Sequence, residues 1–144
     1  MTIAAPPLVL LDSVTQVEPA HAGLLVVTGS HGGASVVPYA RAVRAWLYVF
    51  NDAGVGKEGA GIAALDLLDA DGIAAATVSH DSARIGEASD AWQHGVLSHL
   101  NAAAVALGLL AAQPLSAQLR AAAARGRRGG DCARLARRAP ASRA

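Results

Sequence analysis

Apolar runs alternate with polar, glycine-containing segments along the first half of the chain. Three of these runs, residues 24–28, 46–50 and 73–78, have the length and composition of strands. They carry almost no polar side chains, which is typical of parallel strands that are covered on both faces. Residues 8–11 form a shorter run that predicts a first strand, followed by a loop over residues 14–23. The pattern therefore predicts a mainly parallel sheet of about four strands.

Helical patterns follow the strand runs. Residues 34–44 predict a short helix with Pro38 in its first turn, where proline is tolerated. Residues 59–70 carry apolar side chains at helical spacing and end at Asp71-Gly72, a usual glycine stop. Residues 82–91 predict a loop with one helical turn. Because strand–helix alternation is typical of βαβ units, we predict a single three-layer α/β/α domain, Rossmann-like or flavodoxin-like, over residues 1–113.

The longest helix is predicted over residues 95–112, which are apolar nearly all round a helical wheel. A four-stranded sheet covers only one face of such a helix, and soluble monomers avoid large exposed apolar patches. Two copies packed through the small alanines of residues 96–112 would bury the second face. The sequence thus predicts a homo-oligomer built on this helix, although alanine also faces water without penalty.

The composition changes after residue 113, where arginines stand among alanines and glycines. We expect residues 114–144 to form a helical extension, over residues 115–125, and then a mobile basic tail. The tail has no interleaved aromatic side chains and the net charge is only +1, so neither indicates a nucleic-acid partner. The single cysteine, Cys132, excludes an intramolecular disulfide. No apolar run is long enough to predict a membrane span, and we expect a cytoplasmic protein.

The loop after residues 24–28 is the first of three that carry candidate chemistry. Gly32 and Gly33 allow a ligand to approach the backbone, and the helix that follows offers free N–H groups to an anion. Neither the phosphate-binding P-loop ending nor the dinucleotide-binding glycine pattern is present. A tight turn whose serine caps a helix is the competing interpretation for the glycines. Ser30 and His31 add polar groups, and a turn has no need of an imidazole.

The other two loops are richer in ionisable side chains. Asp52 follows Asn51 at a strand end, where a carboxylate can orient a histidine, hold a metal or act as a base. Lys57 can neutralise an anion, although a solvated lysine is the simpler interpretation. The last loop brings four such residues within five positions: His80, Asp81, Ser82 and Arg84. Since the carboxyl ends of parallel strands share one edge of a sheet, we expect all three loops to meet there.

These residues divide into two candidate groups. The catalytic candidates are the histidines, aspartates and one serine of the loops: His31, Asp52, His80, Asp81 and Ser82. The substrate-binding candidates are Ser30, Gly32, Gly33, Asn51, Lys57 and Arg84. The other histidines, His94 and His99, are interpreted as structural or interfacial, and Asp12 and Ser13 can reach the same edge of the sheet.

Our leading hypothesis is a small-molecule enzyme, a hydrolase or lyase acting on a compact anionic substrate, a carboxylate or amide. His31 or His80 would be the general acid and base, with Asp52 as its orienter and no cofactor. Two variants stay open: a serine–histidine–aspartate nucleophilic set, and a divalent metal held by histidines and aspartates, for which no short ligand spacing is present. The alternative from another class is a non-catalytic module that binds a nucleotide or phosphate through loop amides.

Overall fold

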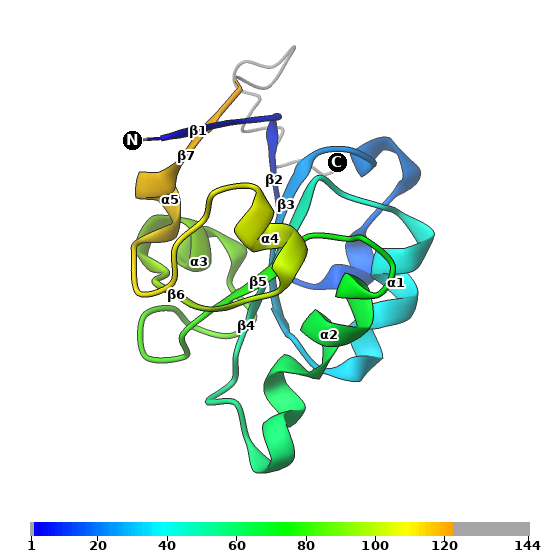
Figure 1. Cartoon of the computed structure of the whole chain (residues 1–144), viewed down its shortest axis with the longest axis vertical. Helices are drawn as coiled ribbons and strands as arrows, with labels where there is room; N and C mark the ends of the chain where they lie inside the picture. The colour runs from blue at the N-terminus through cyan, green and yellow to red at the C-terminus, as the bar shows by residue number, and fades with distance from the viewer. Residues whose placement is uncertain (1, 123–144) are drawn as a thin grey trace.

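A five-stranded sheet runs through the centre of the protein in this computed structural model, which describes residues 2–122 (Figure 1). Its strands lie in the order β2 (Leu8–Leu11), β3 (Leu25–His31), β4 (Leu47–Asn51), β5 (Ala75–Val78) and β6 (Leu97–Leu100). The first four are parallel and β6 is antiparallel to β5. The predicted α/β class is confirmed, with five strands where the sequence predicted about four.

The parallel strands lie side by side in chain order, so the sheet has no point at which the strand order reverses. It differs in this from the Rossmann and flavodoxin orders. The connections carry η1 (Val14–Gln16), η2 (Pro19–His21), η3 (Ala34–Val36), α1 (Val37–Ala42), η4 (Lys57–Ile62) and α2 (Ala63–Asp69). Residues of η1, η3, α1 and α2 share one core with Tyr48 and Phe50 of β4. Each of these connections leads to the next strand in the same direction across the sheet. The helices in the connections therefore all cover the same face of the sheet.

The opposite face is covered by later elements. They are α3 (Ala88–His94), α4 (Ala102–Ala106), α5 (Leu115–Gln118) and a small parallel pair of strands, β1 (Ile3–Ala5) and β7 (Leu119–Ala121). In Figure 1, α3 and α5 lie across the sheet from α1 and α2. Ala91 of α3 and Leu115 of α5 are buried in one core with Val27 and Val49. Leu119 belongs to the same core, so the chain packs against the sheet well past residue 113.

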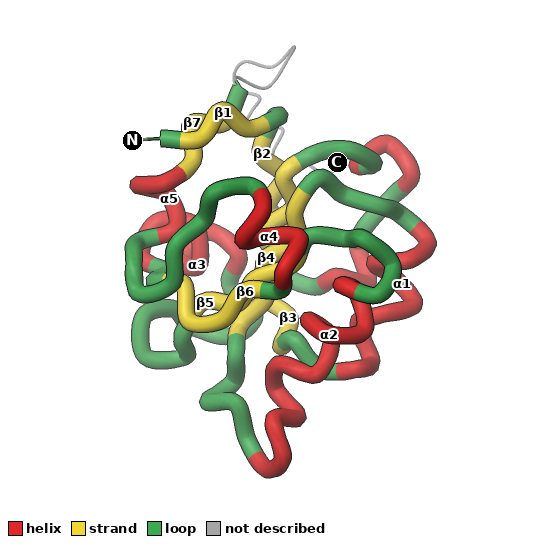
Figure 2. Tube along the Cα trace, viewed as in Figure 1, coloured by secondary structure: helices red, strands yellow, loops and turns green. Residues whose placement is uncertain are grey.

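The predicted long helix over residues 95–112 is wrong. Residues 97–100 form the edge strand β6 and only residues 102–106 are helical (Figure 2). Asn101 separates the two elements: its side chain accepts from the N–H groups of Ala75 and Ala104, and its amide donates to the carbonyls of Leu65 and Ile73. Gly108, at φ +102°, lies just beyond α4. The dimer predicted on residues 96–112 therefore loses its structural basis.

Smaller predictions are confirmed or corrected. Pro38 lies in the first turn of α1 and Gly72, at φ +73°, follows α2, as the sequence predicted. The helix predicted over residues 115–125 ends at Gln118 and is followed by a strand. The predicted tail over residues 126–144, with Cys132, lies outside the described residues. Among residues 2–122, no helix has both the length and the apolar character that crossing a membrane requires.

Candidate functional site

The loops after β3, β4 and β5 meet at the carboxyl edge of the sheet, as predicted. The N–H of Gly32 donates to the carbonyl of Asn51, which joins the first loop to the second. The N–H of His80 donates to Asp52 Oδ1 at 3.0 Å, which joins the second loop to the third. Asp52 is therefore the carboxylate at the centre of the edge.

Asp52 is buried, with only 6 % of its side chain exposed. Its Oδ1 atom accepts from the N–H groups of Gly54, at 2.8 Å, and His80. Burial raises the pKa of the Asp52 carboxyl. That effect is outweighed by hydrogen bonds from Gly54, by the Ser98 hydroxyl beside it, and by the N–H and charge of His80, so the pKa lies below its ordinary value of 3.8. The edge thus holds a buried carboxylate that is ionised at neutral pH.

His80 lies between two carboxylates. Its Nδ1 atom is 3.5 Å from Asp52 Oδ1, and its Nε2 atom is 3.2 Å from Asp81 Oδ1. The two partners differ in burial, because 85 % of the Asp81 side chain is exposed. The His80 ring is itself 55 % exposed. A fixed, buried carboxylate thus faces one ring nitrogen, while the other nitrogen faces solvent and a side chain free to turn away.

His31 has different surroundings at the same edge. Its Nδ1 atom accepts from the N–H of Gly33, two residues along the same loop, at 3.0 Å. Of the residues that the structure describes, no carboxylate forms an ion pair with His31. The structure does not bring His31 and Asp52 together, although the sequence predicted either histidine as the partner of this carboxylate.

Three polar candidates have structural hydrogen bonds. The Ser82 hydroxyl donates to the carbonyl of Ser79 and accepts from the N–H of Val96, so it ties the third loop to the start of β6. The buried Asn51 side chain bridges the carbonyl of Ala83 and the N–H of Ala53. The Ser30 hydroxyl accepts from the N–H of Val14. These contacts hold the loops at the edge in shape.

The two cationic candidates, Arg84 and Lys57, have exposed side chains. Arg84 is 3.8 Å from Glu87, and both side chains are exposed. Lys57 is exposed at the start of η4. Asp12 reaches the edge, but its carboxylate accepts from the N–H of Ala88 at the start of α3. On α3, His94 pairs with Asp90 at 2.8 Å.

The glycine-rich loops use several of their own amides. Gly33 donates to His31, Ala53 donates to the Asn51 side chain, and Gly54 donates to Asp52. Gly32 donates to a backbone carbonyl and is packed so closely that a Cβ there would lie 2.9 Å from the carbonyl of Gly61. These four amides therefore have hydrogen-bond partners within the fold.

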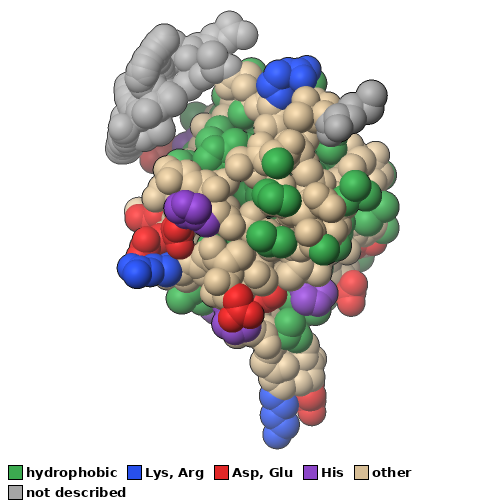
Figure 3. Space-filling model, turned by 90° about the vertical axis from the view of Figure 1, so that its left-hand side faces the viewer, with side chains coloured by type: hydrophobic (Ala, Val, Ile, Leu, Met, Phe, Trp, Pro, Cys, Tyr) green, Lys and Arg blue, Asp and Glu red, His purple; other side chains and the backbone are tan. Residues whose placement is uncertain are grey.

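The loop between β4 and α2 has an unusual backbone. Three residues have positive φ values: 52° at Ala53, 68° at Val55 and 56° at Glu58. Residues other than glycine rarely adopt this left-handed backbone conformation. A β-branched residue such as Val55 is the least suited of them, and strained backbone of this kind clusters at functional sites. The loop projects as a prong at the bottom of the molecule, with acidic and histidine side chains gathered above it (Figure 3).

The sequence did not single out Ser98, which lies beside Asp52, or its neighbour His99 on β6 as site residues. The Ser98 hydroxyl, which lowers the pKa of Asp52, lies 2.9 Å from the Thr77 hydroxyl and 3.3 Å from His99 Nδ1. His99 was interpreted as structural or interfacial because it lies near the start of the predicted long helix. The signal that could have identified it is Asn101, an N-cap residue directly before three alanines, which marks the helix start two residues past His99.

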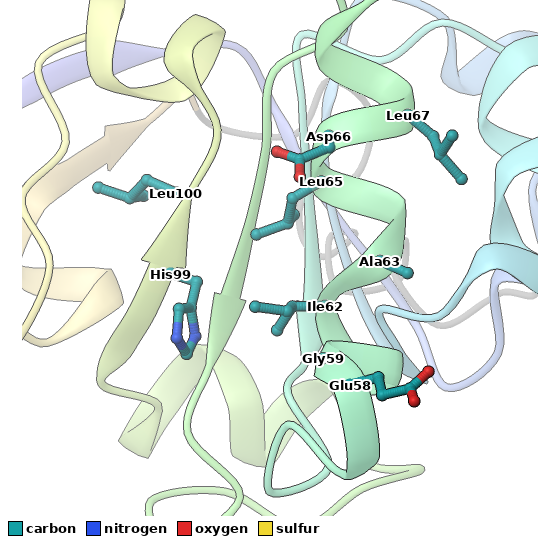
Figure 4. Close-up of a pocket in the computed structure, with 9 residues that line it drawn as sticks. All are labelled: Glu58, Gly59, Ile62, Ala63, Leu65, Asp66, Leu67, His99 and Leu100. Atoms are coloured by element: carbon teal, nitrogen blue, oxygen red, sulfur yellow. The ribbon is translucent and has the colours of Figure 1, made fainter.

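A groove of about 490 Å³ lies between β6 and the η4–α2 segment. In Figure 4 the His99 ring points into it from β6, and Ile62 and Leu65 point into it from the opposite wall. Leu100, Glu58 and Asp66 also line the groove, but the side chains of Leu100 and Glu58 point away from it in Figure 4. Neither Asp52 nor His80 is among the residues that line the groove, so the candidate site is the Asp52–His80 pair and the groove is a separate feature.

Comparison of the chain with protein-family models, with curated proteins and with solved structures finds no match. Within residues 2–122, no group of three or more histidine, cysteine, aspartate or glutamate side chains is arranged to hold a metal ion. At the edge, His80 lies between the carboxylates of Asp52 and Asp81.

Proposed function

We propose that the protein is a small-molecule enzyme, a hydrolase or lyase, that acts on a compact carboxylate or amide through His80 as general acid and base. Asp52 orients His80. The observation that supports this most strongly is the contact between a buried, ionised carboxylate and one nitrogen of a largely exposed histidine ring. This is the arrangement that general acid–base catalysis uses.

Asp52 favours a proton on Nδ1 of His80, because its carboxylate accepts and cannot donate. The Nε2 lone pair is then free to take a proton once Asp81 turns away. In a hydrolysis, Nε2 takes a proton from water as its oxygen attacks the substrate carbonyl. The same proton is then given to the leaving group. In a lyase reaction, Nε2 takes the proton from carbon and returns it to the departing oxygen as water leaves.

The contact between Asp52 and His80 is long for a hydrogen bond, at 3.5 Å. Catalytic hydrogen bonds are often long in ligand-free enzymes and shorten when substrate binds. The amides of the glycine-rich loops are already used within the fold. This favours the enzyme over the phosphate-binding module that the sequence left as an alternative.

The test is a screen of two sets of compounds with wild type and three histidine variants. Compact carboxamides are followed by ammonia release, and compact hydroxy acids by loss of water. His80→Gln should lower the turnover of the active compound by about 10²- to 10⁴-fold, the usual contribution of a general acid–base group. His94→Gln, at an exposed ion-paired histidine on α3, is the matched control.

His31→Gln completes the set and should leave turnover close to wild type. Loss of turnover in His31→Gln with His80→Gln still active would assign the chemistry to the wrong loop and overturn the proposal. So would a screen in which wild type converts none of the compounds.

A further inference from the structure

The two carboxylates that flank the His80 ring differ in how well they can accept its proton. Asp52 Oδ1 already accepts from the N–H groups of Gly54, at 2.8 Å, and His80, at 3.0 Å. It lies 3.5 Å from Nδ1 of the ring, which is longer than an ordinary N–H···O hydrogen bond. Asp81 Oδ1 is 3.2 Å from Nε2, and among the described residues the Asp81 side chain has no other hydrogen-bond or ion-pair partner. The exposed carboxylate is therefore the better acceptor in the ligand-free protein.

The neutral His80 ring has one proton for its two nitrogens. Each nitrogen faces a carboxylate, and an ionised carboxylate can only accept. Asp52 and Asp81 therefore compete for the same proton. When the proton is on Nε2, the exposed nitrogen donates to Asp81, and the lone pair is on Nδ1 beside the buried Asp52. In that tautomer, the exposed nitrogen of His80 has no lone pair with which to take a proton from a substrate.

We propose that Asp81 is a gate on His80: its carboxylate holds the ring proton on Nε2 in the free protein, and a substrate must displace it before His80 can act as a base. The inference rests on the proposed function and adds a regulation of the same site. When Asp81 turns away, Nε2 gives its proton to water and Nδ1 takes one from water, with Asp52 as its acceptor. Asp81 is thus a positioning residue that acts through the His80 ring.

The surroundings of the ring make the Asp81 side chain the part that moves. The N–H of His80 is fixed by its hydrogen bond to Asp52. Gly54 lies against the ring, because a Cβ built there would be 3.6 Å from Nδ1 and 3.7 Å from Nε2. The Asp81 side chain, in contrast, is 85 % exposed. Its rotation into solvent breaks one exposed contact, and such contacts are weak enough for a ligand to displace.

The test measures the tautomer of His80 by NMR of the ring nitrogens in isotope-labelled protein. It is recorded on the alkaline side, where the ring signals no longer change with pH. Wild type should carry the proton mainly on Nε2. Asp81→Ala removes the exposed acceptor, so the fraction of rings with the proton on Nδ1 should rise about twofold or more and become the major form. Asp66→Ala, at another exposed aspartate, on α2, is the matched control and should keep the wild-type tautomer.

Steady-state kinetics give a second readout on a compound that the protein converts. If only the Nδ1–H form binds substrate productively, the apparent affinity is reduced by the fraction of rings in that form. Asp81→Ala should therefore lower KM by the factor by which that fraction rises. The value of kcat should stay within about twofold of wild type, because Asp81 has already turned away in the substrate complex. A merely structural Asp81 would move neither the tautomer nor KM.

The outcomes separate this inference from the proposed function. A wild-type ring that is already protonated mainly on Nδ1 would overturn the gate, as would a tautomer that Asp81→Ala leaves unchanged. His80-dependent turnover in either case would still support the enzyme. A tautomer that shifts in Asp81→Ala and not in Asp66→Ala, in a protein that converts none of the compounds, would support the contact of Asp81 with the ring and overturn the enzyme.

Discussion

Two serine–histidine pairs follow one another at the same edge of the sheet. Ser30-His31 ends β3, and Ser79-His80 follows β5. Both imidazoles are exposed, but His31 binds the backbone of its own loop while His80 contacts a buried carboxylate from β4's end. The comparison shows that a residue from a third segment, Asp52, distinguishes two loops whose sequences look equivalent.

The largest expected effect comes from removing the group that distinguishes the loops. Asp52→Asn should lower turnover on the order of 100-fold or more, because an amide no longer favours the Nδ1–H form of His80. The Asn side chain can still accept from the N–H groups of Gly54 and His80, so the fold should survive. Steady-state kinetics on the compound found by the screen measures the effect.

Asp12→Asn is the matched control for that variant. It makes the same charge change at the same edge, on a carboxylate whose described partner is the N–H of Ala88. Its turnover should differ from wild type by less than about threefold. Equal losses in both variants would show that the edge needs negative charge in general, and the comparison between the two histidine loops would fail.

Much of the fold was predictable because a parallel strand that is covered on both faces appears in the sequence as a short, nearly uninterrupted apolar run. The runs 24–28, 46–50 and 73–78 correspond to β3, β4 and β5, with boundaries that differ by at most three residues. The segment 95–112 was not predictable in the same way. Its alanine-rich apolar pattern fits a buried helix equally well, and the antiparallel pairing of β6 with β5 is a long-range contact.

The sequence predicted which edge of the sheet carries the candidate site, but not which side chains contact one another there. Asp52 was identified as an orienting carboxylate from its position after a strand. Because β4 has β3 on one side and β5 on the other, either histidine could have faced it. His80 is the partner because its own N–H and its ring both contact Asp52 across 28 residues of chain, a long-range contact that no local pattern indicated.

A smaller effect is expected on stability in acid. The pKa of Asp52 lies below its ordinary value of 3.8, so its carboxylate stabilises the folded state fully above that pH. The contribution is lost as the pH falls below 3.8 and through the folded-state pKa. The difference in unfolding free energy between wild type and Asp52→Asn should therefore shrink over that range in denaturant titrations. A difference that stays constant with pH would contradict an ionised Asp52 in the folded protein.

The smallest effects come from two glycines, one beside each histidine ring. Gly54 has φ +76°, so Gly54→Ala should cost about 1–2 kcal/mol in backbone strain, although its Cβ would lie at an ordinary 3.6 Å from His80. Gly33 has φ −82°, and a Cβ there would lie 2.7 Å from the exposed His31 ring, which can swing aside. Gly33→Ala should therefore cost about 1 kcal/mol, because the hydrogen bond from its N–H to His31 is lost and the Ala60 carbonyl, 3.2 Å from the added Cβ, must shift slightly.

The value of the Gly33 variant is that it displaces one histidine and leaves the other untouched. Thermal unfolding gives its stability, and the chemical shifts of the His31 ring show whether the imidazole has moved. If His80 carries the chemistry, turnover should stay at the wild-type rate while those shifts change. A folded Gly33→Ala protein with a displaced His31 ring and little remaining turnover would return His31 to the site and remove the contrast between the two loops.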